Sequence, residues 1–142
     1  MSLDDLYRRV IMDHYQHPRN RGHLGDDSVK IALNNPTCGD RIEVEMKIDD
    51  KGKIEDVKFD GEGCSISLSS ASMMTDVIKG LPVGEALGIA EQFSRLMQGE
   101  DVDLEALGDI QALQGVTKFP ARIKCATLAW KAMQQGIQQY DK

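Results

Sequence analysis

The chain has 142 residues, of which 41% are hydrophobic and 28% charged, a composition typical of one globular domain, and we expect a single domain over residues 1–142. The formal net charge of −6 argues against nucleic acid or an anionic membrane as the partner, because either would need a basic face. No apolar run approaches the roughly 20 residues of a membrane span and the acidic N-terminus does not resemble a secretion signal, so we expect a cytoplasmic protein.

The first predicted element is a helix over residues 3–17. Its apolar residues recur at helical spacing, with Ser2 as a plausible N-cap and Pro18 as the stop. A basic, turn-rich loop follows at residues 19–23 of an otherwise acidic chain. We expect this loop either to contribute to the docking of a partner or to be an ordinary solvated turn.

Three runs of alternating apolar and polar residues come next. They cover residues 29–33, 42–48 and 54–59, and the last two are separated by a hairpin turn at residues 49–52. Hairpin connections predict a small antiparallel sheet of three strands. The apolar positions change parity within the third run, which indicates a β-bulge.

The second half of the chain is predicted to be helical. We expect helices over residues 65–79 and 86–97, a short helix over residues 104–113 after an N-cap at Asp103, and a long amphipathic helix over residues 120–140. The fold class is therefore α+β: a small three-stranded antiparallel sheet covered by helices on one face.

The three cysteines lie at the ends of the predicted elements. Cys38 falls in the turn between the first two strands, Cys64 where the next helix begins, and Cys125 in about the second turn of the last helix. Because their number is odd, they cannot form a closed disulfide framework. Three thiolates with the carboxylate of Asp40 would suit zinc, or iron in a cluster. From spacing alone, a three-cysteine site and buried structural thiols are about equally favoured.

The sequence around the cysteines resembles a known family. Residues 35–40 (NPTCGD), 61–67 (GEGCSIS) and 119–126 (FPARIKCA) resemble the three cysteine motifs of the IscU/NifU-type iron–sulfur scaffold family, and the match covers essentially the whole chain. Scaffold members resembling IscU have a histidine where this chain has Lys124. Residues 99–117 look like the inserted helical region of the SufU branch. The chain therefore looks closest to that branch, and we expect a SufU/IscU-like fold.

The resemblance also implies a metal site and a function. The implied metal ligands are Cys38, Asp40, Cys64 and Cys125. They would hold Zn²⁺ in a sulfurtransferase of iron–sulfur cluster biogenesis, which accepts persulfide sulfur from a SufS-type cysteine desulfurase and stimulates its turnover. We expect the chain to act as an enzyme only together with that desulfurase, upstream of other iron–sulfur assembly proteins. Two alternatives stay open: a scaffold that binds iron or a labile [2Fe–2S] cluster, and a zinc-stabilised domain without a role in turnover.

Within this function, two residues are candidates for catalysis. Cys38 is the expected sulfur acceptor, because its glycine-flanked turn is the most mobile of the three cysteine positions, and docking is expected to release it from the metal. Cys125 is the alternative acceptor. Arg122 lies one helical turn before Cys125, where it would stabilise a thiolate or persulfide or else be a solvated surface cation. The role of Lys124 is open between the same two possibilities, stabilising a thiolate or persulfide and being a solvated surface cation.

Overall fold

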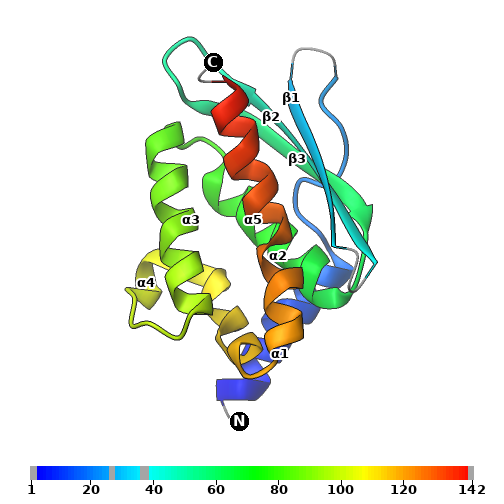
Figure 1. Ribbon diagram of the computed structural model, residues 1–142, viewed down its shortest axis with the longest axis vertical. Helices are drawn as coiled ribbons and strands as arrows, with labels where there is room; N and C mark the ends of the chain where they lie inside the picture. Colours follow the sequence, from blue (N-terminus) through cyan, green and yellow to red (C-terminus); the bar gives the residue numbers. More distant parts are fainter. Residues whose placement is uncertain (1–2, 26–27, 36–38, 141–142) are drawn as a thin grey trace.

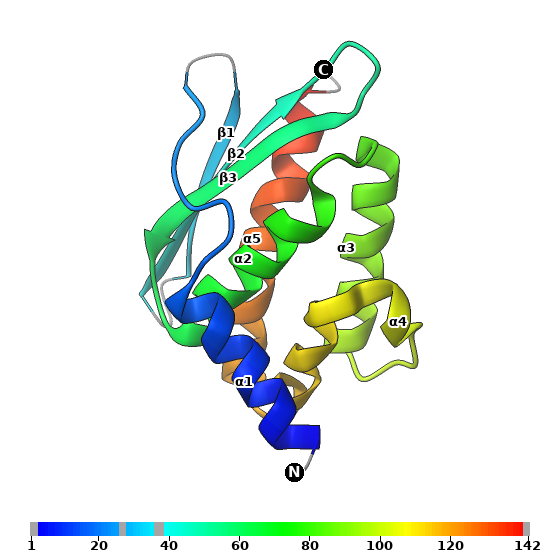
Figure 2. The ribbon, with the colours of Figure 1, turned by 180° about the vertical axis from the view of Figure 1, so that it is seen from behind.

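A three-stranded sheet and a layer of helices on one of its faces make up the computed structural model, which describes residues 3–25, 28–35 and 39–140 (Figures 1 and 2). The elements in chain order are α1 (Leu3–Gln16), β1 (Val29–Asn35), β2 (Asp40–Ile48), β3 (Ile54–Glu62), α2 (Ser65–Ile78), α3 (Val83–Met97), α4 (Leu104–Leu107), the 3-10 helix η1 (Gly108–Lys118) and α5 (Pro120–Tyr140). The sheet is antiparallel with the order β1-β2-β3, so the predicted fold class is confirmed. None of the helices in the described ranges combines the length and apolar character that crossing a bilayer requires.

The predicted bulge lies at the start of β3. Lys47 of β2 pairs with Asp56, but its neighbour Ile48 pairs with Ile54, which leaves Glu55 as the additional residue in β3. An extra residue shifts the alternation of side chains by one position. The apolar residues before and after it therefore both face the helices, which accounts for the change of parity in the sequence.

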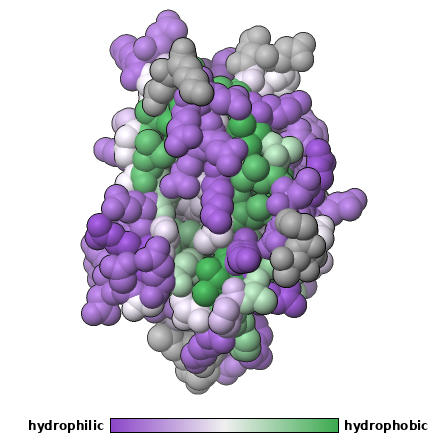
Figure 3. Space-filling model, viewed as in Figure 1, coloured by the Kyte–Doolittle hydropathy of each residue, from purple (hydrophilic) through white to green (hydrophobic). Residues whose placement is uncertain are grey.

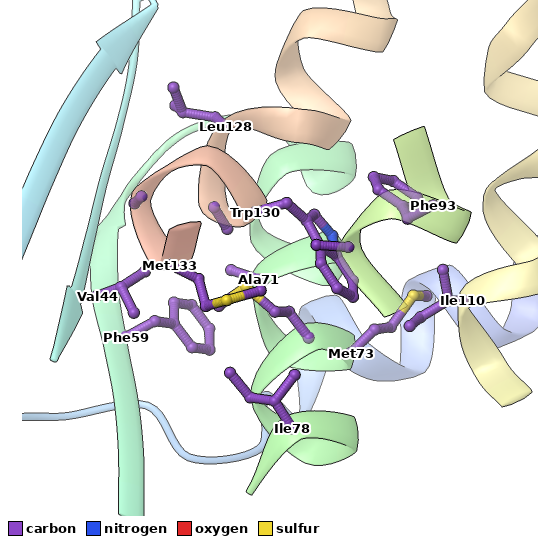
Figure 4. Close-up of a cluster of buried hydrophobic side chains, with 14 of the residues drawn as sticks. Val44, Phe59, Ala71, Met73, Ile78, Phe93, Ile110, Leu128, Trp130 and Met133 are labelled. Carbon is purple, nitrogen blue, oxygen red and sulfur yellow. The ribbon is translucent and has the colours of Figure 1, made fainter. Parts of the chain in front are cut away.

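The core lies between the sheet and two central helices, with α5 against β1 and β2 and α2 against β3 (Figure 4). The rings of Phe93 and Trp130 stack with their centroids 4.8 Å apart. The indole N–H of Trp130 donates to Ser70 Oγ at 3.0 Å, and the Ser70 hydroxyl donates to the carbonyl oxygen of Ala126 at 2.6 Å. These hydrogen bonds satisfy the Ser70 hydroxyl of α2 and the Trp130 indole N–H of α5, both of which are buried.

The segment between α3 and α5 departs from the prediction of one helix over residues 104–113. Asp103 is the N-cap, as predicted, and its carboxylate accepts the Glu105 N–H at 3.2 Å. The α-helix ends after Leu107 because Gly108 adopts a φ of +56°, which does not continue a right-handed helix. The chain then forms the 3-10 helix η1 as far as Lys118.

Two hydrogen-bonded contacts join η1 to α1. His14 is 1% exposed, and its ring nitrogens lie 2.8 Å from Ser72 Oγ and 3.0 Å from Asp109 Oδ2. Nearer the start of α1, the Gln114 side-chain amide donates to the Tyr7 hydroxyl at 2.9 Å. The 3-10 helix η1 is therefore fixed against α1.

The loop after α1 runs along the outer edge of β3 (Figure 2). The Gly22 N–H donates to the carbonyl oxygen of Phe59, and the Phe59 N–H donates to that of Asn20. The cations of the loop are paired within the chain: Arg19 with Asp13, Arg21 with Asp60, and His23 with Glu45 and Asp60. These pairs support a structural role for the loop, and its contribution to docking stays a prediction.

His23 joins this loop to the buried Glu45 of β2. Its Nδ1 lies 2.6 Å from Glu45 Oε2, and its Nε2 lies 3.1 Å from Asp60 Oδ2. The hydrogen bond with Glu45 raises the pKa of His23 above its ordinary value of 6.5. Burial acts to raise the pKa of Glu45, but the hydrogen bonds from His23 and the Leu24 N–H outweigh it and lower that pKa.

We expect the His23 contact to make the stability of the fold depend on pH. Because the folded-state pKa of His23 is raised, its contribution is fully present below about pH 6.5 and is lost as the pH rises through the folded-state pKa. The Tm of His23→Gln should therefore lie below that of the wild type at pH 6 and approach it at pH 8.5. His17→Gln, at the exposed position directly after α1 and outside this network, is the control. Parallel Tm curves for wild type and His23→Gln between these two pH values would contradict the expectation.

Candidate metal centre

Three polar side chains from distant parts of the chain converge at one end of the sheet. Asp40 is the first residue of β2, Cys64 directly precedes α2, and Cys125 lies in the second turn of α5. One ligand atom from each lies within 4.8 Å of those of the other two, and Asp40 Oδ2 is 3.7 Å from Cys64 Sγ. Asp40 and Cys125 are 3% and 1% exposed, and Cys64 is half-buried. The elements thus bring a carboxylate and two thiols together at the edge of the core.

The N-terminus of α2 holds Cys64 in place. Cys64 is the N-cap residue in extended conformation, and its carbonyl oxygen accepts the Leu68 N–H at 3.1 Å. Its own N–H donates to Asp40 Oδ1 at 3.2 Å, and the Ser67 hydroxyl donates to its carbonyl oxygen at 3.0 Å. Asp40 therefore uses one oxygen to hold the backbone of Cys64 while the other faces the sulfur.

Glycine at position 63 allows this close approach. A Cβ built there would contact Ser67 Oγ and would lie 2.8 Å from Asp40 Oδ1 and 2.9 Å from Asp40 Cγ. Real Cβ atoms essentially never lie so close to other heavy atoms. Any side chain at Gly63 would therefore displace the Asp40 carboxylate or the backbone before Cys64.

The guanidinium of Arg122 lies beside both sulfurs. The negative charge of the Cys64 thiolate, followed by a hydrogen bond with Cys125, raises the pKa of Arg122 above its ordinary value. Arg122 is one turn before Cys125 on α5 and has an exposed side chain, so it reaches the site from the solvent side. Lys124 is also exposed.

The donor set is suited to a thiophilic metal ion. Ligand atoms about 2.1 and 2.3 Å from a common tetrahedral centre lie roughly 3.6 Å apart, close to the 3.7 Å between Asp40 Oδ2 and Cys64 Sγ. The structure brings together three of the four ligands that the resemblance implied. The fourth, Cys38, lies outside the described residues, although Gly39 and Asp40 beside it are described.

A second group of ligand-type atoms, those of His23, Glu43 and Glu45, also lies within 4.8 Å. The ammonium of Lys30 is 3.7 Å from both glutamates, and His23 hydrogen-bonds to Glu45. Internal cations therefore already neutralise these carboxylates.

A groove of about 700 Å³ opens beside the thiols, between α1, η1 and the start of α5. Cys64 and Arg122 are among its lining residues, and Tyr7, Met12 and Phe119 contribute apolar surface. Sequence analysis did not predict this groove, because its walls come from segments at opposite ends of the chain. The exposed apolar residue Phe119, directly before the last helix, was the signal that could have indicated it.

Comparison with known proteins identifies the family. A family model described as the NifU-like N-terminal domain matches residues 6–126. The chain belongs to this family. A NifU-like N-terminal domain from Brucella abortus has the same fold, with a TM-score of 0.88 over 98% of this chain and 96% of that one, at 20% identity.

Curated members of the NifU-like family carry two kinds of name. The chain is 60% identical over 137 residues to the zinc-dependent sulfurtransferase SufU of Bacillus subtilis, covering 96% of this chain and 92% of that protein. It is 46% identical over 139 residues to the iron–sulfur cluster assembly scaffold protein IscU of Streptococcus pyogenes, and the match covers 97% of this chain and 86% of that protein. A candidate scaffold protein for the SUF system from Fervidobacterium islandicum superposes with a TM-score of 0.87 at 31% identity, over 96% and 99% of the two chains. The resemblance drawn from the cysteine motifs is confirmed at the level of the family and of similarity to SufU.

Proposed function

We propose that this protein is a zinc-dependent sulfurtransferase of iron–sulfur cluster assembly, which takes sulfur from a SufS-type cysteine desulfurase and stimulates its turnover. The observation that carries the proposal is the convergence of Asp40, Cys64 and Cys125 beside the guanidinium of Arg122. The 60% identity to a relative named zinc-dependent sulfurtransferase supports it. The cytoplasm is the proposed compartment, where free thiols stay reduced.

Cys38, Asp40, Cys64 and Cys125 are the proposed zinc ligands. Zinc has no redox chemistry and therefore holds thiolates together without oxidising them. Asp40 contributes a carboxylate that is already oriented by the backbone N–H of Cys64. This orientation before binding lowers the cost of ordering the site when the ion binds.

Cys38 is the proposed sulfur acceptor. Its thiolate attacks the outer sulfur of the desulfurase persulfide, so that a new S–S bond forms on Cys38 as the S–S bond of the donor breaks. The electron pair of the broken bond leaves with the donor cysteine, which becomes a thiolate and takes up a proton. Arg122 lies beside the other two sulfurs and is proposed to stabilise the negative charge of the persulfide product.

Alkylation and mass spectrometry test which cysteine accepts sulfur. After incubation with the desulfurase and cysteine, the wild type is expected to gain 32 mass units, about one sulfur atom, on Cys38. Cys38→Ala is expected to lose this gain, whereas Cys125→Ala retains some of it if its fold is kept. A Cys38→Ala protein that gains sulfur while Cys125→Ala does not would reverse the assignment. Stimulation of alanine release by the desulfurase distinguishes a sulfurtransferase from a domain that zinc merely stabilises.

A scaffold for a labile [2Fe–2S] cluster is the second candidate function. The relative from Streptococcus pyogenes, which is named as a scaffold, supports it. Lys124 argues against a scaffold function, because its ammonium group cannot replace a histidine as a metal ligand at neutral pH. Visible absorbance after anaerobic reconstitution with iron and sulfide distinguishes the two functions, since a cluster absorbs in the visible range and zinc does not.

A further inference from the structure

The groove beside the thiols has an unusual charge for this chain. Arg8, Lys118 and Arg122 line it, and none of the described residues that line it is acidic. The whole chain carries 23 acidic against 17 basic residues. Within the described ranges, the side chains of Arg8 and Lys118 form no ion pair or hydrogen bond, in contrast to the paired cations of residues 19–23. Arg8 and Lys118 therefore give the groove positive charge that none of the described residues neutralises.

The walls between these cations are apolar. Met12 is 36% and Phe119 61% exposed, two of the few large hydrophobic side chains that the structure leaves open to solvent. Tyr7 and Ile11 line the groove from α1, and Val116 from η1. Aromatic residues, methionine and arginine are the residue types enriched where proteins bind one another. This composition fits a segment of a protein better than a small polar molecule.

The groove is also formed before any partner binds. The Gln114–Tyr7 hydrogen bond joins η1 to α1 at the groove itself, and His14 joins the same two elements through Asp109. In the second of these contacts, the Asp109 carboxylate lies 3.0 Å from Nε2 of the His14 imidazole. A rigid groove loses little conformational entropy when it is filled, which favours tight binding.

We propose that this groove docks the sulfur-donating desulfurase through a segment of the desulfurase in which carboxylates flank apolar side chains. This inference rests on the proposed function, and it adds the surface and the chemistry of the partner. Because Cys64 and Arg122 line the groove, a segment held there would bring the donor sulfur close to the thiols. Positive charge opposite carboxylates would also accelerate association at low salt.

Charge reversal tests the groove. The double variant Arg8→Glu/Lys118→Glu is compared with Arg9→Glu/Lys131→Glu, which makes the same change of net charge at exposed positions of α1 and α5 outside the groove. The affinity for the desulfurase is measured directly by calorimetry, and the half-saturating concentration in the turnover assay is measured alongside it. We expect the groove variant to weaken both by about tenfold or more, with unchanged zinc content, and the control to change them less than about threefold.

The outcomes separate the inference from the proposed function. Equal affinities of the two double variants for the desulfurase would overturn the groove as the docking surface, even if the wild type accepts sulfur. A wild type that binds the desulfurase through the groove but gains no sulfur would overturn the proposed function and leave the docking surface supported. Phe119→Ser tests the apolar part independently of charge and is also expected to weaken binding.

Discussion

Replacing Asp40 with asparagine is expected to lower the affinity for Zn²⁺ by more than about 100-fold, since even residues that only orient metal ligands change affinity by about 10–100-fold. The amide keeps the shape of the carboxylate but loses its negative charge. Asp40 is 3% exposed and also accepts the Cys64 N–H, which the amide oxygen of the variant can still accept. The fold should therefore survive while the ligand is lost. Competition with a chromophoric chelator measures the affinity.

Asp50→Asn is the matched control, because it makes the same chemical change at an exposed position in the turn between β2 and β3. Its zinc affinity should equal that of the wild type. Far-UV circular dichroism checks that Asp40→Asn is folded at the temperature of the titration. A folded Asp40→Asn protein that binds zinc as tightly as the wild type would remove Asp40 from the ligand set.

The second large effect is expected at Gly63. The methyl group of Gly63→Ala would overlap the Asp40 carboxylate and Ser67 Oγ, so the backbone before Cys64 or the carboxylate must move. Such overpacking costs about 1–3 kcal/mol of stability. The displaced carboxylate should also lower zinc affinity by about 10–100-fold. Urea unfolding of the metal-free protein measures the first effect, and chelator competition measures the second.

Gly88→Ala gives the matched comparison. Gly88 lies in α3, and a Cβ there meets no atom within 4 Å. Alanine in a helix interior is expected to stabilise the protein by about 0.5–1 kcal/mol relative to glycine. The two substitutions should thus have opposite signs. A Gly63→Ala variant that is as stable as the wild type and binds zinc as tightly would show that Asp40 is not held where the structure has it.

The regular elements could be predicted from sequence because each buries one face. Helical spacing predicted α1, α3 and α5, and the parity change within the third strand predicted a bulge, which the structure places at Glu55. The end of α4 was missed, because the positive φ of Gly108 is a backbone property that apolar spacing does not report. The hydrogen-bond partners of the buried His14 were not predicted, since Ser72 and Asp109 are 58 and 95 residues away in the chain.

For the candidate site, local motifs indicated the cysteines but not how they are held. Asp40 could be proposed as a ligand from the family motif, whereas its second role, capping the backbone of Cys64, follows from the packing of β2 against the start of α2. The sequence left Arg122 open between a surface cation and a neighbour of the thiols, and the structure places it beside Cys64 and Cys125. Arg8 and Lys118 resemble ordinary solvated cations until the fold brings them to one groove.

The pairing of loops with β3 has a consequence for aggregation. Residues 20–22 pair with the outer edge of β3 at Phe59, and residues 80–82 pair with its first residues. Among the described strands, β1 alone keeps an edge without backbone pairing, so this is where a strand from another chain could extend the sheet. An open edge invites such addition unless a charge interrupts it. The exposed Lys30 places a charged side chain in β1, a residue type that disfavours such addition at an open edge.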